Sequence, residues 1–321
     1  MMKKITTILS ATLLCLVVFA QQTEFEGIMN FRVEVQSKNE LISNKALMNM
    51  LAMGNTMTTM IKHGNYRQIS GISDSYFITK DQKEYIKFKG VDTLYYFEYD
   101  FDTTAVTKVS RSDEKRTIAG IDCKLITIES GGDSKKYYYA PSLYINPEYD
   151  KNNTSGRYDA FVKETSSLYL GLYEESKSFS LSHTCTRVEK VPVNDSVFKL
   201  PDLPQKKFSY NDLTTPPEFT RAGGWEKYLL ANLNGQVASK YLKLPKGEEI
   251  ASQQVMVRFM VNEYGRVVSA EVVNKKEVHP KLAEEALRVV NESPTWKPAK
   301  FFEENVIFWL QAPITFEVSK K

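Results

Sequence analysis

The sequence contains few of the residues on which most enzymes and metal sites depend. Among its 321 residues only three are cysteine and three are histidine. It has no Gly-x-Ser-x-Gly, His-Glu-x-x-His or Cys-x-x-Cys pattern and no glycine-rich phosphate-binding loop. We therefore expect a protein that is not an enzyme and that carries no metal ion or cofactor.

A surplus of charge of one sign is also absent. The chain has 42 Lys and Arg residues against 39 Asp and Glu, and its first 20 residues contribute two of the lysines and none of the acids. Phosphate binding needs a basic surplus gathered on one surface. Nucleic acid is therefore not an expected partner.

Long apolar runs are missing except at the N-terminus. Two lysines precede an uncharged stretch, residues 5–20, which is shorter than the roughly 20 residues of a membrane-spanning helix. This pattern is typical of a signal peptide. We expect residues 1–20 to be removed between Ala20 and Gln21 and the mature protein to be exported to the periplasm. The alternative is that the segment persists as an inner-membrane anchor, with the rest of the chain facing the periplasm.

Cysteine usage predicts one disulfide. Only Cys123 and Cys185 remain in the expected mature chain. In an oxidising compartment an isolated pair is usually a disulfide, which here would close a loop of about 60 residues and stabilise the fold by about 3 to 4 kcal/mol. His183 lies close to Cys185, so a Cys-His pair or half of a metal site is the alternative. Because such sites need more ligands or an exposed thiolate, the disulfide is our prediction.

Prolines separate two parts of the chain. The stretch that lacks a sustained apolar period contains Pro201, Pro204, Pro216 and Pro217. Such a composition is typical of a linker. We place the linker at residues 206–222, between an N-terminal domain (residues 21–205) and a C-terminal domain (residues 223–321).

The N-terminal domain is predicted to be antiparallel and rich in strands. Its clearest strand is Tyr95–Asp102, in which aromatic and acidic residues alternate. The carboxylates of Glu98, Asp100 and Asp102 could hold calcium, but the alternation already explains them as the solvent-facing side of a strand. The other strand-like runs, with turn signals nearby, are Glu26–Val35, Tyr66–Ile72, Tyr76–Phe88, Cys123–Glu129 and Leu168–Leu172.

One segment of this domain has helical spacing instead. After a plausible cap at Ser43 and Asn44, apolar residues follow every three or four positions, at Ala46, Met50, Met53, Met57 and Met60. The main interpretation is a helix that packs as core against the sheet. The alternative is that Met50, Met53, Met57 and Met60 line a binding site, because methionine adapts to apolar ligands.

The C-terminal domain mixes helical and strand patterns. Residues 225–233 fit a short amphipathic helix, and residues 255–261 and 267–273 fit two strands joined by a turn. Pro280 begins a helix with one apolar face, formed by Leu282, Ala283, Ala286, Leu287 and Val290. Residues 306–318 fit a last strand, which Pro313 must place at an edge or a bulge because proline has no backbone N–H.

The order of residues 223–321 resembles the TonB C-terminal domain family. The resemblance is carried by Gly223-Gly224-Trp225, Val257-Arg258-Phe259-Met260-Val261-Asn262 with Gly265 and Val267, Ala286-Leu287 with Val289-Val290, Pro294-Thr295-Trp296-Lys297-Pro298-Ala299 and Pro313-Ile314-Thr315-Phe316. It implies a small α+β module that receives an extended peptide of an outer-membrane transporter as an added strand. Strand addition needs an open sheet edge, whose unpaired N–H and C=O groups the partner completes.

This resemblance implies a partner and a docking strand. The expected partner is an envelope protein, in particular a TonB-dependent outer-membrane receptor. The candidate partner-binding residues lie on the last strand: Phe308, Leu310, Ala312, Ile314 and Phe316. Family members that transmit energy also have a retained N-terminal helix with a polar face and a long proline-rich spacer. Here the apolar N-terminal stretch lacks such a polar face and a folded domain takes the place of the spacer, so the resemblance alone does not imply energy transduction.

The N-terminal domain resembles the exported half-barrel proteins of Bacteroidetes, which are related in shape to periplasmic lipoprotein carriers. The segments that carry this resemblance are Ile118-Ala119-Gly120-Ile121-Asp122-Cys123, Tyr138-Tyr139-Ala140-Pro141 and Asp195-Ser196-Val197-Phe198-Lys199-Leu200-Pro201. It implies a curved antiparallel sheet around a helix, with an apolar concave side. The expected fold class is therefore α+β, a half-barrel followed by a TonB-like domain. The alternative function is a periplasmic carrier or chaperone for a lipid or other apolar ligand held in the half-barrel.

Overall fold

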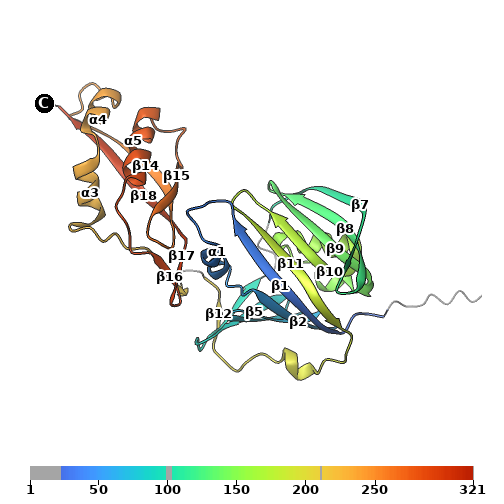
Figure 1. Ribbon diagram of the computed structural model, residues 1–321. Coiled ribbons are helices and arrows are strands. Elements are labelled where there is room, and N and C mark those ends of the chain that lie inside the picture. Colours follow the sequence, from blue (N-terminus) through green and yellow to red (C-terminus); the bar gives the residue numbers. More distant parts are fainter. Residues whose placement is uncertain (1–22, 99–102, 210–211, 321) are drawn as a thin grey trace, which may run out of the picture.

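Strands make up most of the structure. The computed structural model describes residues 23–98, 103–209 and 212–320 (Figure 1). Its largest sheet has twelve strands in the order β12-β6-β5-β4-β3-β2-β1-β11-β10-β9-β8-β7. These are β1 (Gly27–Ser37), β2 (Thr56–Lys62), β3 (Asn65–Ser70), β4 (Ser73–Ile78), β5 (Lys83–Phe88), β6 (Leu94–Glu98), β7 (Val106–Ile118), β8 (Ile121–Ser130), β9 (Asp133–Tyr144), β10 (Ser167–Glu175), β11 (Phe179–Glu189) and β12 (Gln205–Lys207).

The large sheet curves and stays open. Neighbouring strands of this sheet pair antiparallel, except that β12 runs parallel to β6. The two outer strands are β12 and β7. The helix α2 (Tyr158–Thr165) packs against β8 and β9, where the rings of Phe161 and Tyr137 stack with their centroids 4.3 Å apart. Three short 3-10 helices complete this part, Pro147–Tyr149, Ser155–Arg157 and Asp195–Phe198. The prediction of an open, antiparallel half-barrel with a helix is confirmed.

Burial in this sheet follows the period of a strand. Along β1 the side chains of Met29, Phe31 and Val33 are buried, whereas the residues between them are more exposed. Successive residues of a strand point to opposite faces, so one face of β1 belongs to the core. The predicted strand at Tyr95 is β6, which buries Tyr95 and exposes Glu98. The rest of that expected strand, with its two aspartates, lies outside the described residues.

The predicted helix across the methionines is wrong beyond Met50. The helix α1 covers only Asn44–Met50, and the hydroxyl of Ser43 caps it by accepting the N–H of Ala46 at 3.1 Å. The chain then turns, and Met57 and Met60 lie on β2, three positions apart. On a strand, side chains at that spacing point to opposite faces, so the methionines do not form one stripe.

Pairing with strands on both sides explains this difference. The β2 sequence contains the β-branched residues Thr56, Thr58 and Thr59, which pack well on a pleated sheet. It pairs with β1 on one side and, as a hairpin, with β3 on the other. These pairings outweigh the helical spacing of the methionines. The predicted run Tyr76–Phe88 is likewise two strands, β4 and β5, joined by a turn in which Gln82 has a φ of 51°.

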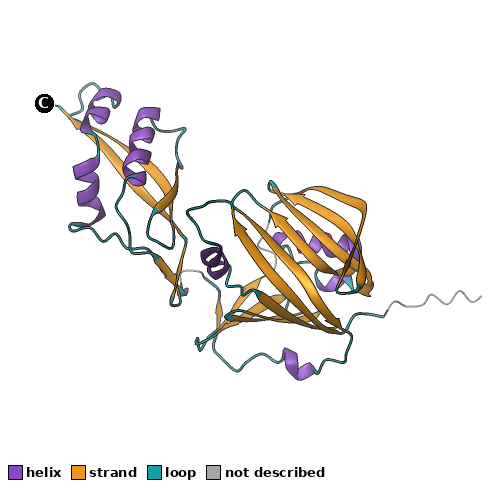
Figure 2. Ribbon diagram, in the orientation of Figure 1, coloured by secondary structure: helices purple, strands orange, loops and turns teal. Residues whose placement is uncertain are grey.

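The C-terminal domain is a small sheet covered by helices on one face (Figure 2). Its three strands run in the order β15-β14-β18 and pair antiparallel. The strands are β14 (Ile250–Val261), β15 (Val267–Val272) and β18 (Phe308–Ser319), and the helices are α3 (Gly224–Asn232), α4 (Gly235–Tyr241) and α5 (Pro280–Asn291). The helices expected near Trp225 and from Pro280, and the three strands, are confirmed.

The helix α5 begins where the sequence predicts. Pro280 occupies its first turn, and Nδ1 of His279 accepts the N–H of Lys281 at 3.2 Å. Its apolar face includes Leu282 and Ala286, which are fully buried against the sheet. The apolar face of α5 packs onto one face of the sheet, and this contact forms the core of the domain.

A third sheet joins the two domains. It consists of β13 (Thr214–Thr215), β16 (Ala299–Phe301) and β17 (Glu304–Val306). The rings of Phe301 and Phe88 meet edge to face at 5.8 Å, so β16 packs against the N-terminal sheet. Glu263 also accepts the N–H of Ser43 across the junction at 2.8 Å. The predicted linker thus contains most of β12, which pairs with β6 of the large sheet, and all of β13, which pairs with β16 of the third sheet.

The predicted disulfide is wrong, because both thiols are free and buried. Cys123 lies on β8 and Cys185 on β11, and two strands separate them in the sheet. Each thiol donates a hydrogen bond to a carbonyl of its own strand, at Ile121 and Arg187 respectively. Burial raises the pKa of both thiols to about 11, so each is protonated in the folded protein near neutral pH.

No helix in the described part of the chain is long and apolar enough to cross a membrane. The predicted signal peptide and its cleavage site at Ala20 and Gln21 lie outside the described residues. They stay predictions.

The state of the thiols can be measured directly. In the chain that begins at Gln21, we expect a thiol reagent such as 5,5′-dithiobis(2-nitrobenzoic acid) at about pH 8 to react very slowly with native protein, because both thiols are buried and protonated. Unfolding in guanidinium without a reductant should expose two reactive thiols. Detection of no free thiol in the unfolded protein would contradict this structure.

Candidate partner-binding site

The strand β18 lies at an edge of the C-terminal sheet. It pairs with β14 along its whole length, from Phe308 opposite Val261 to Ser319 opposite Ile250. On its other side it has no strand neighbour among the described residues. The opposite edge, β15, has six residues against twelve in β18. The longer edge without a strand neighbour is therefore β18, and the helix α4 contacts this strand. We refer to it as the open edge.

The register decides which backbone groups face this open edge. Met256 is opposite Pro313, and its carbonyl accepts the N–H of Val273 on the β15 side at 2.9 Å. The N–H and C=O of one strand residue point the same way, so Met256 does not bond to β18. Pro313 consequently faces the open edge, where its missing N–H breaks no bond to β14.

Because backbone groups alternate in direction along a strand, Pro313 also fixes the direction of the other N–H and C=O groups of β18. Residues of β18 at even positions bond to β14, and those at odd positions point their N–H and C=O groups outward. The outward set is Trp309, Gln311, Pro313, Thr315, Glu317 and Ser319. Pro313 offers only a carbonyl, so the open row has two N–H donors before this gap and three after it.

The predicted partner-binding residues turn their side chains from β18 into the core. Ile314 and Phe316 are buried in the core, and Leu310 and Ala312 pack against the same cluster. Phe308 packs at the junction with the N-terminal domain. The strand proposed from the sequence is an edge of the sheet, but the residues named on it are those whose backbone bonds to β14. The position of Pro313 is the signal that distinguishes the two sets, because proline is tolerated where no ladder bond is needed.

An aromatic and a cationic side chain lie beside the open edge. The Arg258 guanidinium lies over the Trp309 ring, 4.4 Å from its centroid. Arg258 also approaches Glu271 of β15, with N and O atoms 3.6 Å apart. Trp309 is 37% exposed, so part of its ring is available to a strand that arrives at β18.

His183 and Cys185 occupy the buried side of β11. Burial, with the nearby charge of Lys135, lowers the pKa of His183 to about 4, so its imidazole is neutral. The hydroxyl of Tyr169 lies 3.4 Å from its Nδ1. Within the described ranges no group of three or more His, Cys, Asp or Glu residues could hold a metal ion.

The four methionines do not line one site. Met53 and Met57 border a cavity of about 150 Å³, together with the polar side chains of Gln68, Ser70 and Glu84. Met50 and Met60 do not border it. The apolar ligand site suggested by the sequence is therefore not assembled from these residues.

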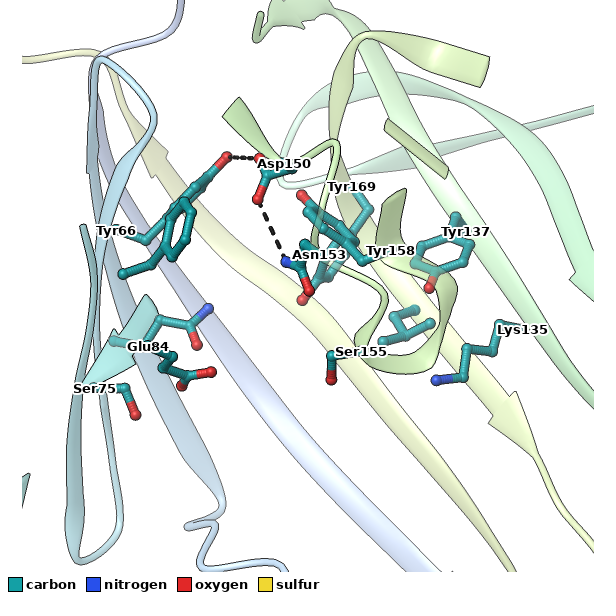
Figure 3. Close-up of a pocket in the computed structure, with 13 residues that line it drawn as sticks. Tyr66, Ser75, Glu84, Lys135, Tyr137, Asp150, Asn153, Ser155, Tyr158 and Tyr169 are labelled. Atoms are coloured by element: carbon teal, nitrogen blue, oxygen red, sulfur yellow. Dashed lines mark hydrogen bonds between the residues drawn. The ribbon is translucent and has the colours of Figure 1, made fainter. Parts of the chain in front are cut away.

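A different cavity lies on the concave side of the large sheet (Figure 3). Its most deeply buried acid is Asp150, which is 1% exposed. The Tyr66 hydroxyl and the Asn153 amide donate to its two carboxylate oxygens at 2.8 and 3.4 Å. Burial raises the pKa of Asp150 to about 6, and these two hydrogen bonds act in the opposite direction. In the described part of the chain, no cationic side chain pairs with this carboxylate.

Comparison with known proteins gives a family for the C-terminal domain. Residues 251–318 match the family model described as Gram-negative bacterial TonB protein C-terminal. The match runs from β14 to β18 and confirms the resemblance of this domain. No curated protein matches the chain.

Solved structures resemble this chain only weakly. Two structures of PNGF-II, in the P21 and C2 space groups, align with TM-scores of 0.36 and 0.34 and sequence identities of 10% and 11%. The alignments cover 75% and 74% of this chain but only 45% and 44% of those chains. The protein thus spans less than half of their length, and scores this low establish no shared fold or function.

Amide hydrogen exchange tests the assignment of the edge. We expect slow exchange at the amides that bond to β14, which are those of Leu310, Ala312, Ile314 and Phe316. The outward amides should exchange much faster, since water can reach them without opening the sheet. These belong to Trp309, Gln311, Thr315 and Glu317. The measurement is residue-resolved exchange by NMR, and equal protection of both sets would rule out the open edge.

The buried carboxylate predicts a pH dependence of stability. Because the pKa of Asp150 is about 6 in the folded protein against an ordinary value of 3.8, the fold favours its protonated form and loses stability as pH rises from about 4 through 6. At roughly 1.4 kcal/mol per pKa unit, the loss is about 3 kcal/mol. The variant Asp150→Asn lacks this titration. Urea unfolding from about pH 4 to 7 should show native protein losing about that much relative to the variant, and parallel curves would contradict the prediction.

Proposed function

Because residues 251–318 match the TonB C-terminal family, we propose that this protein is a non-enzymatic component of a Gram-negative envelope whose C-terminal domain binds an envelope partner by strand addition at β18. The partner that we propose is a TonB-dependent outer-membrane transporter. The protein reaches it in the periplasm after export by residues 1–20. The open edge of β18 is the observation that carries this proposal.

Strand addition at this edge uses the outward backbone groups. A partner segment in an extended conformation can exchange hydrogen bonds with Trp309 and Gln311 on one side of Pro313, and with Thr315 and Glu317 on the other. Backbone bonds supply affinity without reading sequence, whereas the ring of Trp309 offers an apolar contact beside them. The gap at Pro313 also limits unwanted pairing, because an edge with a missing donor is a poorer template for aggregation.

The N-terminal domain replaces a spacer. In this chain the TonB-like sheet follows a folded half-barrel, and the third sheet, β13-β16-β17, packs between the two domains. A docked partner is therefore held beside the half-barrel instead of at the end of a long flexible tether. We accordingly propose that the role of the C-terminal domain is docking to the transporter.

The proposal can be tested with two proline variants. Thr315→Pro removes one outward N–H of β18 and leaves the bonds to β14 in place, because that amide faces the open edge. Ala270→Pro is the matched control, since Ala270 is opposite Phe259, whose own bonds run to β18, and so its amide faces the outer side of β15. Both variants should retain the native circular dichroism spectrum.

The measurement is photo-crosslinking in cells from a benzoylphenylalanine residue at Gln311. We expect a crosslink to an outer-membrane transporter, reduced about tenfold by Thr315→Pro through the lost bond and the bulk of the proline ring, and unchanged by Ala270→Pro. Absence of any envelope protein among the crosslinked products would refute the proposal. So would an equal reduction by both variants.

A further inference from the structure

The cavity on the concave side of the large sheet has no part in strand addition at β18. It lies between β3, β4 and β5 on one side and β9, β10 and the segment after β9 on the other. Its volume is about 230 Å³. A cavity of about 150 Å³ accommodates benzene, so this one has room for a molecule of roughly nine non-hydrogen atoms.

One end of the cavity is built from hydrogen-bond acceptors. The partners of the Asp150 carboxylate are neutral, the Tyr66 hydroxyl and the Asn153 amide nitrogen. Asn153 is itself 8% exposed, and its Oδ1 has no hydrogen-bond partner. The orientation of this amide is fixed, because only its nitrogen can donate to the carboxylate. A buried carboxylate without a cation and a buried carbonyl without a donor therefore lie side by side (Figure 3).

The walls of the cavity are mostly aromatic. They include Tyr66, Phe77, Tyr137, Tyr158 and Tyr169. Two further charged side chains, Glu84 and Lys135, border it. Lys135 is paired with Glu174 at 3.1 Å, and Figure 3 draws it at the far end from Asp150.

We propose that this cavity binds a small molecule that carries a primary ammonium group, with its N–H donors directed at the carboxylate of Asp150 and at Oδ1 of Asn153. An ammonium group has three donors and no acceptor, so it can satisfy both oxygens at once. Its charge compensates the buried carboxylate, which is costly to leave unpaired. The surrounding rings add a favourable environment for a cation.

Other ligand classes fit this end less well. An alcohol has a single O–H donor and no charge, so it satisfies one of the two oxygens and leaves the carboxylate uncompensated. A carboxylate or phosphate ligand would face two acceptors that cannot donate to it. The chemistry of the cavity therefore selects for a cation with several donors.

The test compares benzylamine with benzyl alcohol, which have the same number of non-hydrogen atoms and the same ring. Both are titrated calorimetrically into the full-length protein at about pH 8, where Asp150 is ionised. We expect benzylamine to bind at least about tenfold more tightly than the alcohol. Asp150→Asn should reduce this preference to about threefold or less, whereas Asp202→Asn should keep it. Asp202 is an exposed carboxylate away from the cavity, so it matches the change in net charge.

Several outcomes would overturn the proposal. They are equal affinity of the amine and the alcohol, no binding of either ligand at millimolar concentration, and a preference that survives in Asp150→Asn. If that variant does not fold, native protein at about pH 5 replaces it, because Asp150 is then protonated. A preference for benzylamine that persists at that pH would also count against the assignment.

Discussion

The pairing of β18 with β14 over twelve residues is the interaction on which the C-terminal domain depends. It buries Ile314 and Phe316 in the core of the domain, and by the same alternation it turns a row of backbone groups toward the open edge. A shift by one residue would exchange the two sides of the strand and expose its apolar face. Pro313 fixes the choice, because in the shifted register it would leave a carbonyl of β14 without a donor.

The rest of the molecule limits where this edge can move. The strand β17 directly precedes β18 and contacts α1 of the N-terminal domain. Phe301 packs against Phe88, and Glu263 accepts a hydrogen bond from Ser43, so the junction combines apolar and polar contacts. The open edge of β18 is thus carried on a folded body. The same body contains the cavity at Asp150, where the curved sheet brings β3 to β5 opposite β9 and β10.

Much of this fold could be predicted from local patterns, and the errors have a common cause. The helix from Pro280 and the strand containing Val257 are each set by spacing within one segment, and both are correct. The methionine segment failed because pairing of β2 with β1 and β3 outweighs helical spacing. The disulfide failed because each thiol is buried and donates to a carbonyl of its own strand, an arrangement that the sequence does not display. The cavity was missed because its walls come from segments far apart in the chain.

In the proposed function a partner strand forms on β18. Amide hydrogen exchange of the full chain, with and without a saturating transporter peptide, tests this directly. We expect new protection at Trp309, Gln311, Thr315 and Glu317, with no change at the amides that already bond to β14. Protection that appeared at β15 instead, or at neither edge, would contradict it.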